Sequence, residues 1–535
     1  MSFASKFTNG VFMRFLVFLF FNAIMNTSIL NKTKEVKVWK NKKTRRVFFA
    51  LKGGYISIYI LIATSVAVTL LTGLVIFVTG VQKRSYNEMA RNKALQIAES
   101  GVYYYQWYLA HNLDGKNVIQ IRNFWEESPL GVDAPYEAEV TGFFDEAIGR
   151  YKLEVEPPDP DSTIVVLTST GWTYRHPEIK KSVKVRFRRP SWSEYSVLGN
   201  DMLRFGEDTN IYGPVHSNNG IRFDGIANNL IMSAVEEYYD PDTKDYRPGV
   251  WTSQPDESAV FLAGKDFPVP SIDFNGVIVD LFHMEEEAQS SGLYFGGESY
   301  QEENCRWKHG NSWCGGNFWC WVCTSETVSI EGYHITLRPD DKMEVRYVED
   351  YQGDSFHEPK TYKISKEGEP IIFDIPSSGL VFCADNVWVD GQIDTAKVTI
   401  VSAKLESSDD TSIYINDNIL YTNRDGRDVI GLVAEKDISI GLFSANDLEI
   451  DAALLAQKGR VGRDYYTESQ SNAFYKRDQI TVYGSIATNE RYGFAWTDGT
   501  GYQMRNLYFD NNLLYYPPPY FPTGNVYELD LWEDL

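Results

Sequence analysis

The chain has 535 residues, which is too long for one ordinary hydrophobic core, so we expect several domains. Hydrophobic residues make up 43% and charged residues 23%, a balance typical of folded proteins that excludes wholesale disorder. The formal net charge is −22, and such an acidic surface repels phosphates, so nucleic acid is not an expected partner.

The first 52 residues are strongly basic, in contrast to the rest. They hold eleven Lys and Arg and one acid, Glu35, for a formal charge of +10, which leaves −32 for the remainder. We interpret residues 1–54 as a basic leader. Its apolar run from Val11 to Met25 is short for a spanning helix. The run fits either a helix on the membrane surface or an upstream start codon included in error, and we favour the second.

An apolar span follows the leader. Tyr55 to Val81 carries no charge, and its 27 residues reach roughly 40 Å as a helix, enough to cross a bilayer. The helical pattern continues to about Asn112 without proline, which predicts a transmembrane and stalk helix over 55–112. Basic residues before an apolar span favour a cytoplasmic N-terminus. We therefore expect a single-pass cell-membrane protein whose C-terminal domains lie outside.

A small antiparallel sheet is predicted over residues 113–190, packed on the stalk. The strand-like runs are Tyr136–Thr141, Gly149–Val155, Thr163–Ser169 and Lys181–Arg188. The stalk residues expected to cover the sheet are Tyr103, Tyr104, Trp107 and Tyr108.

The rest of the chain predicts a mainly-β head, so the fold class is α+β. We divide it into a β-rich segment with a Trp/Cys insertion (191–378) and a solenoid-like segment with a Pro-rich tail (379–535). From Gly379 onward, short apolar strands between polar turns resemble the coils of a parallel β-helix, with irregular spacing. A β-sandwich is the alternative, because the same run lengths allow it. One short helix is expected over Val277–Glu287.

The start of the apolar span, Lys52-Gly53-Gly54-Tyr55, resembles the prepilin signal of type IV pilins. In that family a membrane prepilin peptidase cuts after the glycine, which implies cleavage between Gly54 and Tyr55. The fifth residue after the cut is usually Glu, whereas here it is Tyr59. The resemblance therefore implies a minor rather than a major subunit. An ordinary anchor that is never cleaved is the alternative.

Three further stretches carry the same resemblance. Ala98-Glu99-Ser100-Gly101, with Ala94 one turn earlier, resembles the Ala-Glu-x-Gly motif of minor pilins of the PilX kind. The segment Ser191–Gly225 and the stretch DNNLLYYPPPYFPTG resemble the two ends of a large β-rich ectodomain found behind pilin-like stalks. The resemblance implies a surface or pilus-assembly protein whose partners are other pilin-like subunits.

A Trp/Cys window stands out within the head. It contains Cys305, Trp307, Trp313, Cys314, Trp319, Cys320, Trp321 and Cys323. In an exported domain we expect these cysteines to form disulfides, with three possible connectivities. A stapled loop with exposed indoles would suit stacking on surface glycans, although a purely structural role is equally open.

Two other interpretations of this window remain. Cys320-x-x-Cys323 fits half a zinc site, but the gap from Cys305 to Cys314 does not fit the usual partner spacing, and we expect no metal. The window could also be a packed insertion without a ligand. The fifth cysteine, Cys383, is expected to be buried in a strand.

Catalysis is not expected. Asp385, Asp390 and Asp394 would allow a polysaccharide-active β-helix enzyme, because acid/base hydrolysis needs two carboxylates. Asp also fills solenoid turns for backbone reasons, however. No EF-hand loop, phosphate-binding glycine loop or HExxH motif occurs, so we expect no cofactor. The predicted function is type IV pilus assembly or adhesion, and a permanently anchored surface adhesin is the alternative.

Overall fold

A computed structural model describes residues 54–535, apart from 114, 117, 143, 160–161, 275–276, 298, 311–313, 315–317, 354–358, 406 and 525. The predicted leader up to Gly53 therefore lies outside the described residues. The chain divides into two compact units, Met1–Gln82 and Lys83–Leu535, and each is described by itself.

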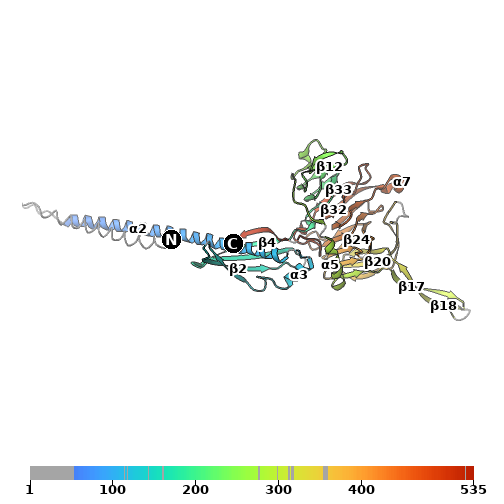
Figure 1. Cartoon of the computed structure of the whole chain (residues 1–535), viewed down its shortest axis with the longest axis horizontal. Helices are drawn as coiled ribbons and strands as arrows, with labels where there is room; N and C mark the ends of the chain where they lie inside the picture. Colours follow the sequence, from blue (N-terminus) through green and yellow to red (C-terminus); the bar gives the residue numbers. More distant parts are fainter. Residues whose placement is uncertain are drawn as a thin grey trace, which may run out of the picture. The chain divides into compact units, whose positions relative to one another are not determined.

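The longest element is helix α2 (Gly54–Leu113), which confirms the helix predicted over 55–112 (Figure 1). Its 60 residues measure about 90 Å. It ends where Gly115 takes a φ of +69°, a left-handed conformation that closes helices at low cost for glycine. Among the described residues it is the one helix whose length and composition suit a membrane span.

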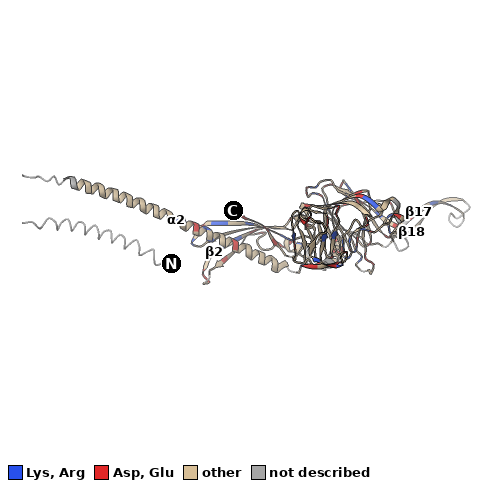
Figure 2. Cartoon of the chain, turned by 90° about the horizontal axis from the view of Figure 1, so that it is seen from above, with Lys and Arg blue, Asp and Glu red and all other residues tan. Residues whose placement is uncertain are grey.

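The first part of α2 is apolar and exposed. Up to Gln82 it carries no Lys, Arg, Asp or Glu, as its uniform tan colour shows (Figure 2). Its few hydroxyls bond within the helix: Thr69 Oγ1 donates to the carbonyl of Ser65 at 2.8 Å, and Thr72 Oγ1 to that of Val68 at 2.7 Å. A polar group without a partner is costly in hydrocarbon, so these bonds make this part of α2 compatible with a bilayer.

The first sheet of the second unit has five antiparallel strands in the order β1-β2-β3-β4-β34. Their bounds are β1 (Tyr136–Thr141), β2 (Ala147–Glu156), β3 (Ile164–Thr173), β4 (His176–Arg188) and β34 (Glu528–Asp534). The first four confirm the predicted strands. Helix α3 (Val118–Glu126), which places Ile121 and Trp125 in the core of this sheet, was not predicted, and neither was β34.

The second part of α2 packs on this sheet through Val102, Tyr105 and Leu109, each with 0% of its surface exposed. The predicted face was partly wrong, because Tyr103 and Trp107 are 62% and 53% exposed. The buried side follows the line of Ala98, Val102, Tyr105 and Leu109, and Tyr103 and Trp107 lie off that line. Tyr104 and Tyr108 contact the core from its edge.

The second sheet contains 22 strands. They are β5 (Val197–Gly199), β7 (Thr209–Ile211), β8 (Val215–Ser217), β10 (Ile226–Ala227), β11 (Ile231–Ser233), β15 (Lys265–Asp266), β16 (Leu293–Phe295), β19 (Gly332–Arg338), β20 (Lys342–Tyr351), β21 (Ile364–Glu367), β22 (Ile371–Asp374), β23 (Leu380–Cys383), β24 (Val387–Ile393), β25 (Lys397–Ser402), β26 (Ile413–Ile415), β27 (Ile419–Tyr421), β28 (Val429–Ala434), β29 (Ile438–Ile440), β30 (Asp447–Ala456), β31 (Val461–Arg463), β32 (Lys476–Thr488) and β33 (Gly501–Phe509).

Smaller elements complete the second unit. They are a three-stranded sheet of β6 (Leu203–Phe205), β9 (Ile221–Phe223) and β14 (Val250–Trp251), the hairpins β12 (Glu237–Asp240)–β13 (Asp245–Pro248) and β17 (Ser299–His309)–β18 (Trp319–Ser329), the helices α4 (Glu257–Val260), α5 (Val277–Ser290) and α7 (Glu468–Ser471), and the short 3-10 turns η1 (Trp192–Glu194), η3 (Asn472–Tyr475) and η4 (Asn511–Leu514).

The 22-stranded sheet is built mainly of parallel rows. The longest row runs β16-β23-β25-β28-β30-β32-β5-β8-β11-β15. A second row is β19-β24-β26-β29-β31, and a third is β27-β30-β32-β33-β7-β10. Buried Ile, Val and Leu side chains from all three rows form one core.

The order of the longest row differs from the order of the chain. Strand β5 follows Ser191 in sequence yet pairs with β32, where Val197 lies opposite Ile486. Strands from the predicted 191–378 and 379–535 segments consequently share one sheet. The early strands cover an edge of β32 that would otherwise expose unpaired backbone groups.

Two elements cover the outer side of the longest row. Helix α5, at the position predicted, contributes Leu281 and Met284 to a cluster that includes Phe382. The Pro-rich tail covers the neighbouring strands, and a Cβ atom at Gly431 would lie 2.7 Å from Cβ of Pro518. The tail therefore packs as a cap before the chain returns to the first sheet as β34.

Candidate functional site

The predicted stalk motif lies where α2 meets the first sheet. Ala94 and Ala98 are fully buried. A Cβ atom at Gly101 would lie 2.5 Å from Ser169 Oγ, and one at Gly171 would lie 2.3 Å from the carbonyl oxygen of Ala94. Distances below 3.0 Å leave no room for a side chain, so these small residues let the helix and β3 approach closely.

Glu99 behaves differently from the other motif residues. It is half-exposed, and no hydrogen bond or ion pair reaches its side chain from the part of the chain that is described. The structure thus brings Ala94, Ala98 and Gly101 onto the sheet, whereas nothing in it explains Glu99.

The predicted cleavage residues stand at the beginning of α2. Gly54 is its first residue, and no acid occurs in the first turn. Tyr59, at the position where pilins usually carry Glu, has 70% of its surface exposed. Cleavage between Gly54 and Tyr55 stays a prediction, because the residues before Gly54 lie outside the described range.

The Trp/Cys window forms the hairpin β17–β18 rather than the predicted loop. Its antiparallel register places Cys305 opposite Cys323, Trp307 opposite Trp321 and His309 opposite Trp319. Alternate residues share a face, so these six side chains lie on one face of the hairpin. The high β-propensity of the Trp- and Cys-rich run was the available signal for strands.

The tryptophans of this face are open to solvent. Trp307, Trp319 and Trp321 are 60%, 64% and 56% exposed. The rings of Trp307 and Trp321 meet edge-on, with 5.6 Å between centroids. We call Trp307, Trp319 and Trp321 the aromatic face. The fourth predicted aromatic residue, Trp313, lies outside the described residues.

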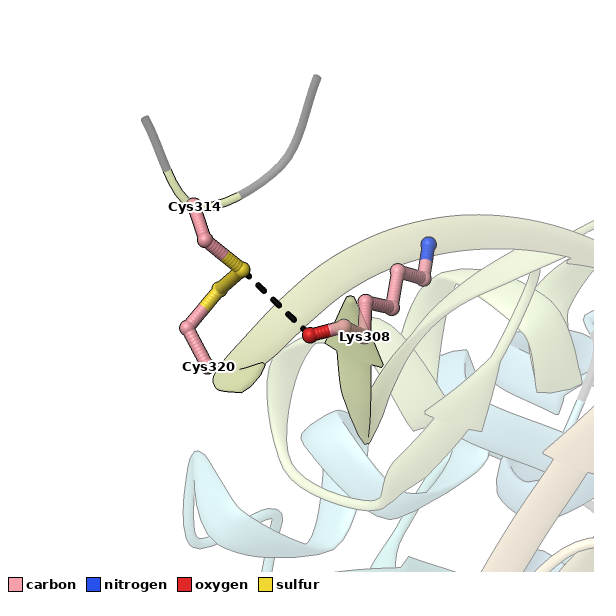
Figure 3. Close-up of a disulfide and its surroundings, with 3 residues drawn as sticks. All are labelled: Lys308, Cys314 and Cys320. Atoms are coloured by element: carbon pink, nitrogen blue, oxygen red, sulfur yellow. Dashed lines mark hydrogen bonds between the residues drawn. A yellow bond between two sulfur atoms is a disulfide. The ribbon is translucent and has the colours of Figure 1, made fainter. Parts of the chain in front are cut away.

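Both disulfides of the window are within the hairpin. Cys305 bonds Cys323 across the strands, and Cys314 bonds Cys320 near the turn (Figure 3). The Sγ atom of Cys314 lies 3.3 Å from the carbonyl oxygen of Lys308, a contact rather than a hydrogen bond, because a disulfide sulfur carries no proton. Since the thiols are joined in disulfides, they do not offer the thiolates that zinc requires.

Cys383 lies apart from the hairpin. It ends strand β23 and is fully buried, as predicted, and burial raises the pKa of its thiol. A buried thiol of raised pKa is chemically inert in the folded chain.

The hairpin supplies surface rather than chemistry. Arg306 is exposed on the face opposite the tryptophans. Exposed indoles gain free energy by stacking on sugar rings or apolar surfaces. The aromatic face therefore suits binding.

The predicted acidic residues each have a different partner. Asp385 accepts a hydrogen bond from the backbone N–H of Asn386 at 2.8 Å, and Asp394 accepts one from Asn423 Nδ2 at 2.6 Å. Asp390 accepts one from His334 and is considered next. Each carboxylate thus satisfies a turn or a neighbouring side chain, which is the usual work of Asp in such turns.

His334 on β19 bridges two carboxylates, Asp390 on the adjacent strand β24 and Glu367 on β21. Its Nδ1 lies 2.7 Å from Glu367 Oε2, and its Nε2 lies 2.9 Å from Asp390 Oδ2. Both ring nitrogens must donate to bond two carboxylates, so the imidazole is protonated. Burial lowers the pKa of His334, but the bonds to Asp390 and Glu367 outweigh it and raise the pKa to about 9.

Comparison with known proteins adds little. No family model and no curated protein matches the chain. Among solved structures, the chain is similar to the crystal structure of the competence-associated pilin ComZ from Thermus thermophilus, with 13% identity, a TM-score of 0.29, and coverage of 83% of this chain and 97% of that chain. At that TM-score the likeness carries no weight.

Proposed function

We propose that this chain is an exported, membrane-anchored pilin-like surface protein that acts in type IV pilus assembly or adhesion. One observation carries the proposal: the single helix α2 is apolar and exposed in its first part and buried on an antiparallel sheet in its second. An apolar anchor that continues into a packed stalk is what a helical filament subunit needs.

Processing at the start of α2 belongs to the same proposal. Gly54 opens the helix, and prepilin peptidase would cut between it and Tyr55. The basic residues of the leader favour a cytoplasmic N-terminus, with the later domains outside the membrane. Tyr59 in place of Glu, together with the buried Ala98 and Gly101, supports a minor subunit of the PilX kind.

We further propose that the head is a parallel β-helix-like solenoid. Three rows of parallel strands around one apolar core support it, because each coil of a solenoid buries its neighbour. A β-sandwich is built of antiparallel sheets, so the parallel rows count against that alternative. Such a head would display the aromatic face, with surface glycans as its proposed ligands.

Catalysis has no part in the proposal. Asp385, Asp390 and Asp394 each have a separate structural partner. A glycosidase instead needs two carboxyl groups held roughly 5–10 Å apart on either side of a bond. A polysaccharide-active enzyme therefore lacks a specific observation in its favour.

Shearing filaments from cells with and without prepilin peptidase tests the proposal. We expect the chain to co-purify with the sheared filaments when the peptidase is present and to stay in the membrane fraction when it is absent. Gly54→Ala should mimic loss of the peptidase, and Gly53→Ala, one residue before the cut, is the matched control. A Gly54→Ala variant of unchanged size and location would instead favour a permanently anchored adhesin.

A further inference from the structure

A second candidate binding site lies on the 22-stranded domain, away from the hairpin. It is a cavity of about 990 Å³ between the early strands near β6 and the segment that follows β32. Arginines line it from both sides, including Arg204 and Arg222 from the early strands and Arg491 and Arg505 from the later segment. A cavity of this size accommodates a small oligosaccharide-sized ligand.

Arg505 forms part of the cavity wall and is only 9% exposed. Its Nε donates to Thr209 Oγ1 at 3.1 Å, and its Nη1 donates to the carbonyls of Tyr502 and Gln503 at 2.7 and 2.9 Å. These acceptors are neutral and leave its charge uncompensated. Within the described chain no hydrogen bond reaches Nη2, and Gly206 leaves space beside that atom.

Arg491 is the second arginine of the cavity that forms no ion pair with a described residue. It is half-buried, and burial lowers the pKa of its guanidinium. No hydrogen bond or ion pair reaches its side chain from any described residue. Asp242, Asp240 and Asp201 act on it electrostatically without forming an ion pair. Asp242 already pairs with Arg204 and Arg222.

The acids of the cavity that the structure describes form no ion pair with these two arginines. Asp224 is 8% exposed and is occupied by Arg222 Nε at 2.8 Å and the backbone N–H of Ser253 at 2.8 Å. The other acids of its lining apart from Asp242, namely Asp201, Glu207, Asp208 and Glu490, are exposed, and water solvates them. An unpaired buried charge destabilises the folded chain strongly, whereas an exposed one costs almost nothing. Among the arginines of the cavity, Arg491 and Arg505 are therefore the two that an anionic ligand would pair with.

Other residues in the cavity wall indicate what kind of molecule bears the anionic group. Trp496 is 39% exposed, and Arg460 lies over its ring with 5.6 Å from the guanidinium carbon to the centroid. An indole ring stacks on the apolar face of a sugar. The rim carboxylates of Glu207 and Asp208 accept hydrogen bonds, which suits sugar hydroxyls. A small inorganic anion would use neither feature.

We propose that this cavity binds an oligosaccharide bearing a carboxylate, such as a uronic acid, with the carboxylate at Arg491 and Arg505 and a sugar ring at Trp496. The site is independent of the proposed pilus role. The cavity would bind its ligand even if the chain were never cleaved. Failure of the cavity proposal would leave the proposed pilus role unaffected.

The test uses the full-length protein in detergent and trigalacturonate as the probe. Tryptophan fluorescence or calorimetry should show saturable binding, and neutral galactotriose should bind at least about tenfold more weakly, since charge-assisted hydrogen bonds are lost. Arg491→Gln should weaken trigalacturonate binding by about tenfold or more. Trp496→Leu, a second variant, should weaken the binding of both trigalacturonate and galactotriose.

The control is Arg427→Gln, which removes an exposed arginine that pairs with Asp425 on a different turn. It should bind trigalacturonate like the unmodified protein, and thermal unfolding checks that each variant is folded. Three results would overturn the proposal: no saturable binding of trigalacturonate, equal binding of galactotriose, or unchanged binding by folded Arg491→Gln. Binding of triglutamate in place of the sugar would assign the cavity to an acidic peptide and overturn it as well.

Discussion

The hydroxyl of Ser169 on β3 donates a hydrogen bond to the backbone carbonyl of Ala98 on α2, with 2.7 Å between the oxygen atoms. A strand side chain reaches a helix carbonyl only when the two backbones lie close together. Ala98, Gly101 and Gly171 allow this, because none of them places a large side chain between the helix and the sheet. The stalk and the first sheet consequently form one packed body.

Gly171→Val tests this close contact. Its Cβ would lie 2.3 Å from the carbonyl oxygen of Ala94, so the helix must move away from β3. We expect the free energy of unfolding to fall by about 3 kcal/mol, as measured by denaturant unfolding of the full-length protein in detergent. Gly493→Ala is the control, because its Cβ would meet no atom within 4 Å. Equal stability of Gly171→Val and the unmodified protein would contradict the account.

Local patterns were sufficient to predict α2 and the four strands β1 to β4. They did not predict β34, because its partner strand β4 lies far away in the sequence. Local hydrophobic periodicity does not encode the pairing of two distant strands. The buried helix face was misjudged for a related reason. Tyr103 and Tyr105 are both aromatic, and only the position of the sheet decides that Tyr105 is buried.

His334 should make stability depend on pH. Its pKa rises from an ordinary 6.5 to about 9 in the folded chain, so the folded state binds the proton more tightly than the unfolded state. The resulting stabilisation, about 3 kcal/mol at most, is complete below pH 6.5 and is lost as the pH rises through 9. We expect the free energy of unfolding to decrease between pH 6.5 and pH 9.5.

The comparison variant for this prediction is His334→Gln. A glutamine side chain does not take up a proton in this pH range. The difference in free energy of unfolding between this variant and the unmodified protein should therefore narrow as the pH rises. His309→Gln on the exposed hairpin is the control for the replacement of a histidine elsewhere in the chain. A gap that stays constant from pH 6 to pH 9.5 would show that the bridge to Glu367 and Asp390 does not hold a proton.

Thiol counting should distinguish the hairpin cysteines from Cys383. The chain has five cysteines, and Cys383 is the free one. We expect no reaction of the native protein with a thiol reagent, one reactive thiol after unfolding without reductant, and five after unfolding and reduction. More than one reactive thiol in the unfolded, unreduced protein would contradict the paired hairpin.

The aromatic face should carry surface binding without carrying stability. Replacing Trp307, Trp319 and Trp321 by Ala should reduce adhesion of cells to glycan-coated surfaces and leave thermal unfolding unchanged, because these rings are exposed. Tyr239→Ala with Tyr246→Ala is the matched control, since these exposed rings form a similar edge-on pair on the hairpin β12–β13. Equal loss in both variants would mean that any exposed aromatic pair serves, and would refute a specific role for the Trp hairpin.

The sequence identified the Trp/Cys window as a candidate site but not its form. Three disulfide connectivities were open, and the register that places Cys305 opposite Cys323 selects one of them. The cavity beside Arg491 was not predicted at all. It forms only because the early strands pack next to the segment that follows β32, through the pairing of β5 with β32. No local pattern in the sequence encodes that long-range arrangement.

The most direct test of the central proposal is N-terminal sequencing of the mature protein from cells that contain prepilin peptidase. The account predicts a chain that begins at Tyr55, the second residue of α2. A mature chain that begins at Met1, or anywhere else before Tyr55, would contradict processing as a pilin-like subunit.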